Sequence, residues 1–355
     1  MNANLLFHIL LALAVVVIAG RLMGQLVSAI GQPPVIGEVL SGILLGPSLL
    51  GLVAPGAEAF LFPAAVRPPL GAVAQVGVVV YMFLVGLEFD TGLLKQRAAP
   101  LIVTSQASII GPFLLGCALG VGLHSRLAPG AVSVTAFALF MGVAMSITAF
   151  PVLARILTDR GLTRTSLGVA ALTCAAINDV MAWCLLALVV GATRAMPSGG
   201  VPGELVIAFA IGAVVPHHGA FARSMTMWLN GIVTVMLLPA FFAMTGLRTQ
   251  IGLVSSAREW TICLAIILVA TAGKFGGAAL AGRLMGMSWR FAAQLGALMN
   301  TRGLMELVVL NVGLDAGLIS PTLFTMMVIM ALVTTAMTTP LLALASGGSF
   351  SRRRK

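Results

Sequence analysis

Long apolar segments separated by short polar ones make up most of the chain, and they do not alternate with polar positions as strands would. A helix that crosses a bilayer needs about 20 apolar residues. The pattern predicts ten full crossings, at residues 5–30, 33–52, 70–90, 99–123, 132–157, 165–193, 224–246, 259–285, 290–313 and 319–345. A further apolar piece, 204–216, would cover only about 20 Å of a hydrocarbon core of about 30 Å, so we expect one short crossing there.

The composition changes this picture only by excluding other classes of protein. Of the 355 residues, 59% are hydrophobic and 8% are charged, whereas roughly 25% are charged in soluble domains. A cytosolic enzyme, a nucleic-acid-binding protein and a disordered chain are therefore excluded, and the lack of alternation excludes a transmembrane barrel. We predict an all-α polytopic membrane protein. The four cysteines lie in apolar segments without paired spacing, and we expect no cofactor and no resident metal.

The charge distribution predicts how the chain sits in a membrane. Most of the 20 Lys and Arg residues lie between or beside the apolar segments, so they indicate topology and contact with lipid headgroups rather than binding to nucleic acid. The basic tail 346–355 predicts a cytoplasmic C-terminus. Eleven crossings then place the N-terminus outside, and we expect the inner membrane of a bacterium.

Parts of the sequence also repeat. Gly86-Leu87 closes the third predicted helix, and Gly246-Leu247 closes a later crossing in the same way. By the crossing count these two helices run in opposite directions, which is the arrangement of an inverted repeat. Chance matches in a glycine-rich chain are the alternative.

Four ionisable residues lie at mid-membrane depth, where charge is costly and usually functional. They are Asp179, Lys274, Arg302 and Glu306. Arg302 and Glu306 are four residues apart on one helix, so they can form an ion pair, and this pair fits a structural role. Asp179 and Lys274 have no local partner, and we expect them to pair across helices. Such a pair could exchange a proton for a cation, although Lys274 could also be a structural counter-ion only.

The segment Ser146 to Pro151 interrupts the predicted helix 132–157. Pro151 cannot donate to the carbonyl four residues back, so the helix should kink or unwind near Thr148. Unwound backbone at this depth is tolerated where it is buried or lines a cavity, and its carbonyls with the Thr148 hydroxyl could ligate a cation. Residues 300–303 lie at a similar depth in the second repeat, which predicts two broken helices. A plain proline kink is the alternative.

Five motifs in order resemble the monovalent cation:proton antiporter-2 family, nearest its cation/H⁺ exchanger branch. They are QPPVIGEVLSGILLGPSLLG (32–51), SITAFPVLARIL (146–157), Asn178-Asp179, Lys274 and LMNTRGLMELVVLNVG (298–313). The resemblance implies thirteen crossings with an inverted repeat, and a homodimer. It also implies that Asp179 binds proton and cation alternately, that Asn178 shapes the site, that Thr148 lies at a broken helix, and that Lys274 lies opposite.

The chain departs from that family in one place. Only nine residues separate Arg194 from Glu204, where the family has two more helices, one of which helps to form the dimer. We expect a single transmembrane domain, 1–345, with a transport core (99–194 and 259–345) and a scaffold (1–90 and 204–246). The dimer should be weakened by the missing scaffold helices.

These observations predict a secondary transporter that exchanges K⁺ or Na⁺ for protons, and not an enzyme. An intramembrane aspartyl protease would need two carboxylates that share a site, and Asp179 is the one Asp at mid-membrane depth. A symporter or a channel would have the same composition. A truncated, non-transporting paralogue or assembly partner is the other alternative.

Overall fold

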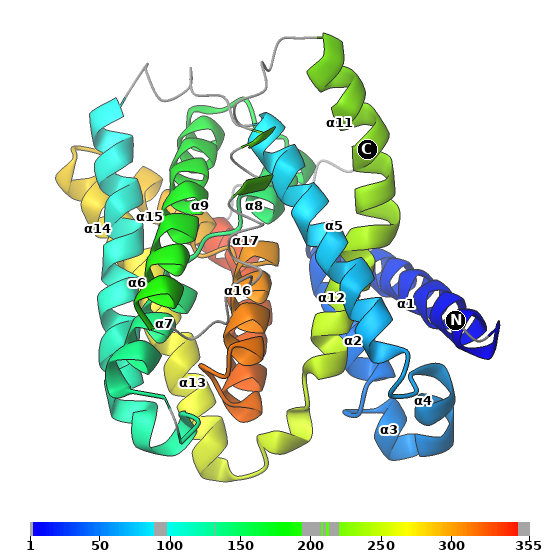
Figure 1. The fold of residues 1–355 in the computed structure, drawn as a ribbon. Coiled ribbons are helices and arrows are strands. Elements are labelled where there is room, and N and C mark those ends of the chain that lie inside the picture. The colour runs from blue at the N-terminus through cyan, green and yellow to red at the C-terminus, as the bar shows by residue number, and fades with distance from the viewer. Residues whose placement is uncertain are drawn as a thin grey trace. The chain divides into compact units, whose positions relative to one another are not determined.

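The computed structural model describes residues 3–88, 98–130, 132–193, 207–208, 211–212 and 220–346. These residues form helices and no strand, which confirms the predicted all-α fold (Figure 1). Within the described ranges, 9 helical stretches are long and apolar enough to cross a membrane. The remaining predicted crossing, 290–313, is divided into two shorter helices.

Several expectations fall on residues outside the described ranges. The predicted short crossing 204–216 is described only at 207–208 and 211–212. The segment between Arg194 and Glu204 and the basic tail 347–355 are not described either, so their predictions stay predictions.

The chain divides into two compact units. One comprises Met1–Asp90 with Ser198–Val254, and the other comprises Thr91–Pro197 with Ser255–Lys355. Each unit therefore combines an early and a late part of the sequence.

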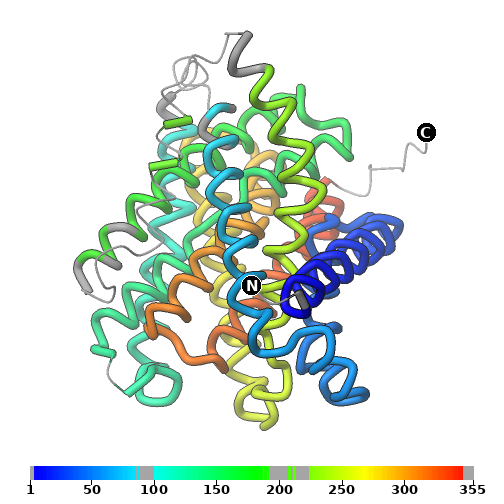
Figure 2. The backbone as a smooth tube through the Cα atoms, turned by 45° about the vertical axis from the view of Figure 1, so that its right-hand side comes forward, coloured from blue at the N-terminus to red at the C-terminus, as the bar shows by residue number. Residues whose placement is uncertain are grey.

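The first unit contains four of the expected crossings and two short helices that the apolar pattern did not predict. Its described elements are α1 (Ala3–Ala29), α2 (Pro34–Leu45), α3 (Leu50–Val53), α4 (Pro55–Leu61), α5 (Arg67–Glu88), α11 (Ala220–Ile232), the π-helical turn η2 (Val233–Leu237), α12 (Leu238–Arg248) and the 3₁₀ turn η3 (Ile251–Leu253). The helix is shorter than the predicted 33–52, since α2 ends at Leu45, two residues before Pro47. A proline disfavours helical backbone at the residue that precedes it. The two short coils after it, α3 and α4, lead into α5 (Figure 2).

Small residues allow α2 and α12 to pack closely. A Cβ added to Gly42 would lie 2.1 Å from the Ala243 carbonyl oxygen, and one added to Gly246 would lie 2.4 Å from the Val39 carbonyl oxygen. The two backbones therefore touch at positions where no larger residue fits, as is common between membrane helices.

The second unit repeats one order of elements. Its described elements are α6 (Ala98–Leu127), α7 (Val134–Ser146), α8 (Phe150–Asp159), α9 (Ser166–Thr193), α13 (Ala257–Thr271), the π-helical turn η4 (Ala272–Gly276), α14 (Gly277–Leu284), α15 (Trp289–Met299), α16 (Leu304–Asp315) and α17 (Pro321–Ala345). In each half a broken helix, α7/α8 or α15/α16, follows one long helical stretch and precedes another. The two predicted interruptions are thus present.

Serine side chains fix where several helices of this unit begin. Ser133, Ser256, Ser288 and Ser320 each accept a hydrogen bond from a backbone N–H in the first turn of the helix that follows. Ser256 and Glu259 complete a capping box at the start of α13. These caps satisfy N–H groups that have no partner within the helix.

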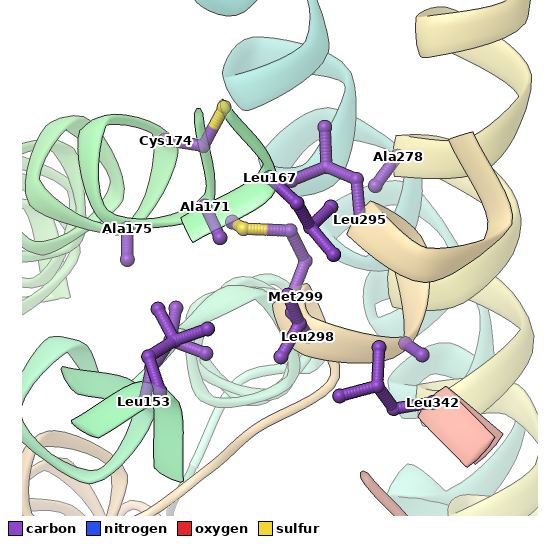
Figure 3. Close-up of a cluster of buried hydrophobic side chains, with 12 residues drawn as sticks. Leu153, Leu167, Ala171, Cys174, Ala175, Ala278, Leu295, Leu298, Met299 and Leu342 are labelled. Atoms are coloured by element: carbon purple, nitrogen blue, oxygen red, sulfur yellow. The ribbon is translucent and has the colours of Figure 1, made fainter. Parts of the chain in front are cut away.

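A cluster of buried apolar side chains holds the elements of this unit together. Figure 3 shows side chains from α8, α9, α14, α15 and α17 that converge, among them Leu153, Ala171, Leu295 and Met299. Met299 is the last residue of α15, so the packing fixes the position at which that helix breaks.

Candidate functional site

The first interruption lies between α7 and α8. Ile147 and Ala149 have extended backbone angles, with φ −75° and ψ 142° at Ile147 and φ −91° and ψ 97° at Ala149. Pro151 lies in the first turn of α8. Backbone N–H groups in the first turn have no partner within the helix, so the N–H that proline lacks is not needed there. The proline therefore begins the second half-helix, and three residues that include Thr148 are left without helical hydrogen bonds.

The second interruption lies between α15 and α16. α15 ends at Met299 and α16 begins at Leu304, with Gly303 before it in an extended conformation. A Cβ added to Gly303 would lie 2.5 Å from Val152 Cγ2. Glycine is therefore required at this position by the close approach of α8.

The two interruptions are bonded to each other. The Ala149 backbone N–H donates to the Thr301 carbonyl oxygen at 3.1 Å. The Thr148 hydroxyl donates to the Met299 carbonyl oxygen at 3.2 Å. Each broken segment thus supplies partners for polar backbone groups that the other would leave unpaired.

Asn178 and Thr148, two of the predicted site residues, come into contact. The amide of Asn178, on α9, lies within hydrogen-bond distance of three hydroxyl oxygens, those of Ser105 (2.7 Å), Ser108 (2.9 Å) and Thr148 (3.1 Å). The side chains of all four residues are fully buried. The amide therefore connects α6, α9 and the first interruption.

Lys274 also reaches Thr148. It lies in the π-helical turn η4, which interrupts the regular hydrogen bonding between α13 and α14, and such turns are frequent at functional sites. The Lys274 amine donates to the Thr148 hydroxyl at 2.5 Å, and the side chain is fully buried.

The expected direct pairing of Asp179 with Lys274 is not what the structure has. Both residues are described, and no ion pair within 4.0 Å joins them. The amine donates to the Thr148 hydroxyl instead. The sequence could not reveal this because it places both residues at the same depth without fixing the direction of either side chain.

The Asp179 carboxylate is buried. Its side chain is 3% exposed, and neither carboxylate oxygen has a partner with hydrogen-bond geometry among the described residues. The Phe150 backbone N–H, at the beginning of α8, interacts with the carboxylate electrostatically. A helix N-terminus favours negative charge nearby. A buried carboxylate to which no described residue makes a hydrogen bond of good geometry is suited to accept a proton or to ligate a cation.

Arg302 and Glu306 form the predicted ion pair, with a distance of 3.1 Å from Arg302 Nη1 to Glu306 Oε1. The guanidinium also donates to the Ala144 carbonyl oxygen at 3.1 Å and to the Met145 carbonyl oxygen at 2.8 Å. These are carbonyls of the last turn of α7, which have no partner within the helix. The pair therefore ties the second interruption to the end of α7.

Comparison with known proteins identifies the family. The sodium/hydrogen exchanger transmembrane family matches residues 10–215 and 198–344, nearly the whole chain. The chain belongs to this family. It is a family of membrane transporters and not of enzymes, so the chain is an integral membrane protein, and the resemblance seen in the motifs is confirmed.

Two curated relatives match the chain over almost its whole length. It is 39% identical to the Na⁺/H⁺ antiporter NhaS4 of Synechocystis sp., over 96% of this chain and 98% of that protein. It is 34% identical to cation/H⁺ antiporter 17 of Arabidopsis thaliana, over 94% of this chain and 48% of that protein. The exchanger thus spans about half the length of this plant relative.

A solved structure shows the same fold. The sodium proton antiporter MjNhaP1 from Methanocaldococcus jannaschii superposes with a TM-score of 0.63 at 13% identity, over 98% of both chains.

The alignment of this chain with NhaS4 runs over 400 positions, whereas the chain has 355 residues. At some aligned positions NhaS4 therefore has a residue and this chain has none.

Two residues of the exchanger's site were missed in the sequence. Ser105 and Ser108 lie in the apolar run of α6, and serine in a membrane helix commonly bonds a carbonyl of its own helix. Their spacing of three residues on one face was the only signal, and it did not indicate a partner on α9.

Proposed function

We propose that this protein moves a monovalent cation, K⁺ or Na⁺, across the membrane in exchange for protons, and that Asp179 binds the two ions alternately. The family and the names of the relatives support cation:proton exchange. The observation that carries the role of Asp179 is its buried carboxylate, whose two oxygens accept no hydrogen bond of good geometry from the described residues.

The chemistry of coupling follows from the burial of this carboxylate. With a proton bound it is neutral, and with a monovalent cation bound the pair is neutral in effect. The empty, charged form would have to move through a low-dielectric interior at a cost of several kcal/mol. Transitions between inward-facing and outward-facing states are therefore restricted to the two loaded forms, and each cycle exchanges one ion for the other.

The neighbouring residues take roles that match their contacts. The Thr148 hydroxyl and the Asn178 amide would add oxygen ligands beside Asp179, and Lys274 would act as a counter-charge that Thr148 keeps close. The Arg302–Glu306 pair would hold the two interruptions in register. Pro151 would set where α8 begins, so that the Phe150 N–H meets the carboxylate.

We assign the transport core to 99–194 with 259–345 and the scaffold to 1–90 with 204–246. The separation of the chain into two compact units along nearly these boundaries supports the assignment. We expect a homodimer, weakened by the short segment after Arg194, in a bacterial inner membrane with the N-terminus outside and the C-terminus in the cytoplasm.

A second possibility is a truncated paralogue or assembly partner that does not transport. The aligned positions at which this chain has no residue favour it. Expression of the chain alone, followed by purification and reconstitution, separates the two possibilities, because a non-transporting partner would give intact protein without exchange.

The decisive assay uses vesicles with a preset pH gradient, to which K⁺, Na⁺ or Li⁺ is added while the gradient is followed with a pH-sensitive dye. We expect wild-type protein to collapse the gradient and Asp179→Asn to insert normally but to give no exchange. Asn178→Ala, at matched protein levels, should change the apparent cation affinity only. Wild-type rates in Asp179→Asn would exclude the proposed role of this carboxylate.

A further inference from the structure

Two serines of α6 contact the Asn178 amide, and the proposed function has not used them. Ser105 and Ser108 are three residues apart and so lie on one face of the helix. Both are 0% exposed, as is Asn178. A buried contact between three polar side chains in a membrane protein needs a reason, because apolar residues would fill the same space without desolvation.

The two ends of the amide meet different chemical groups. At the Ser105 end lie the Ser105 hydroxyl at 2.7 Å, the Ser105 carbonyl oxygen at 3.2 Å and the Cys174 carbonyl oxygen at 3.3 Å. Carbonyl oxygens can only accept, so this end suits the amide NH₂ group.

The other end of the amide faces hydroxyl groups. The Ser108 hydroxyl lies at 2.9 Å and can donate to an amide oxygen, and the Thr148 hydroxyl, whose own proton is on the Met299 carbonyl oxygen, lies at 3.1 Å. The Ser108 hydroxyl therefore favours the amide oxygen at this end, with the NH₂ group on the carbonyl oxygens of Ser105 and Cys174.

We infer that Ser105 and Ser108 are positioning residues that hold the Asn178 amide with its oxygen toward Thr148. In this orientation Asn178 offers a cation an oxygen ligand, of the kind that replaces the hydration shell of K⁺ or Na⁺. The reversed amide would present N–H groups, which repel a cation. This inference rests on the proposed exchange of a monovalent cation, and it makes α6 a determinant of cation affinity.

The test measures exchange in vesicles for Ser105→Ala and Ser108→Ala, with Thr104→Val as the matched control. Thr104 is a buried neighbour on α6 whose hydroxyl donates to the Pro100 carbonyl oxygen of its own helix at 2.7 Å. We expect the KM for the cation to rise roughly fivefold to tenfold in each serine variant, as for the loss of one hydrogen bond. The maximal rate should stay near wild type. Ser108→Thr keeps the hydroxyl and should keep the wild-type KM, and so should the control Thr104→Val.

Combination with Asn178→Ala separates positioning from a general loss of structure. If the serines act through Asn178, adding either serine change to Asn178→Ala raises the KM no further. Increases that add up in the double variants would overturn the inference, and so would an unchanged KM in both serine variants.

Cation-dependent thermal stabilisation of the purified variants gives a second readout, because it reports binding without transport. A wild-type protein that neither exchanges ions nor gains stability from K⁺, Na⁺ or Li⁺ would remove the proposed function and the inference together. Normal wild-type exchange with unaffected serine variants would remove the inference alone.

Discussion

The Thr148 hydroxyl takes part in three of the site's hydrogen-bond contacts, so replacing it should have a large effect on stability. The hydroxyl accepts from the Lys274 amine, contacts the Asn178 amide and donates to the Met299 carbonyl oxygen. Thr148→Val keeps the shape of the side chain and removes all three interactions at once. Thr148→Ser keeps the hydroxyl and loses one buried methyl group.

The magnitude follows from the groups left without partners. Lys274 is fully buried and has one hydrogen bond recorded, to Thr148. Leaving a buried donor unpaired costs about 1–3 kcal/mol, and more when it is charged, and loss of the bond to Met299 adds about 1 kcal/mol. We expect Thr148→Val to lower the free energy of unfolding by about 2–4 kcal/mol. Thr148→Ser should lower it by only about 1 kcal/mol, for the missing methyl group.

The measurement is unfolding of both variants and wild type in one detergent, followed by thermal shift and by denaturant titration at a fixed pH and cation concentration. Vesicle exchange on the same preparations shows whether the loss of stability is accompanied by loss of cation affinity. Equal stability of the Val and Ser variants would refute the reasoning, because it would mean that the hydrogen bonds of the Thr148 hydroxyl make no net contribution to the free energy of unfolding.

Three further predictions concern other parts of the core. Lys274→Met should move the pH optimum of exchange upward, because without the nearby positive charge a proton competes better with the cation at Asp179; an unchanged pH profile would contradict the counter-charge role. Gly303→Ala should destabilise the protein by about 1–3 kcal/mol, as overpacking does, because the added Cβ meets Val152; a thermal shift compared with Gly122→Ala, where an added Cβ meets nothing within 4 Å, would measure it. Glu306→Gln should destabilise the core, because Arg302 keeps its bonds to α7 but loses its charge partner, and unfolding at the wild-type denaturant concentration would contradict this.

The course of the helices was largely predictable from the sequence, because long apolar segments in this chain have few alternatives to a membrane crossing. The first interruption was predictable from Pro151, and the second from the matching position of residues 300–303 in the repeat. The short helices α3 and α4 were missed because eleven residues divided between them are too few for a periodic signal. The π-helical turn around Lys274 has no signature in its composition.

The members of the site were easier to predict than their partners. Asp179, Lys274, Arg302 and Glu306 stand out because charge is rare in this chain, and the pairing of Arg302 with Glu306 follows from their spacing on one helix. The partner of Lys274 depends on the direction in which η4 points the amine. That direction is set by tertiary packing, which the sequence does not show. The two serines of α6 were overlooked for a related reason: a hydroxyl in a helix gains its significance from the neighbour that it meets.

The hydrogen bonds between the two interruptions limit how the site can change shape. Two hydrogen bonds join the broken segments. One runs from the Ala149 backbone N–H to the Thr301 carbonyl oxygen, and the other from the Thr148 hydroxyl to the Met299 carbonyl oxygen. Neither half-helix can slide along the other without leaving several buried polar groups unpaired. If this site binds ions as proposed, we expect its ligand geometry to stay the same during transport, so that access to the ion changes by movement of the two broken helices as one rigid body.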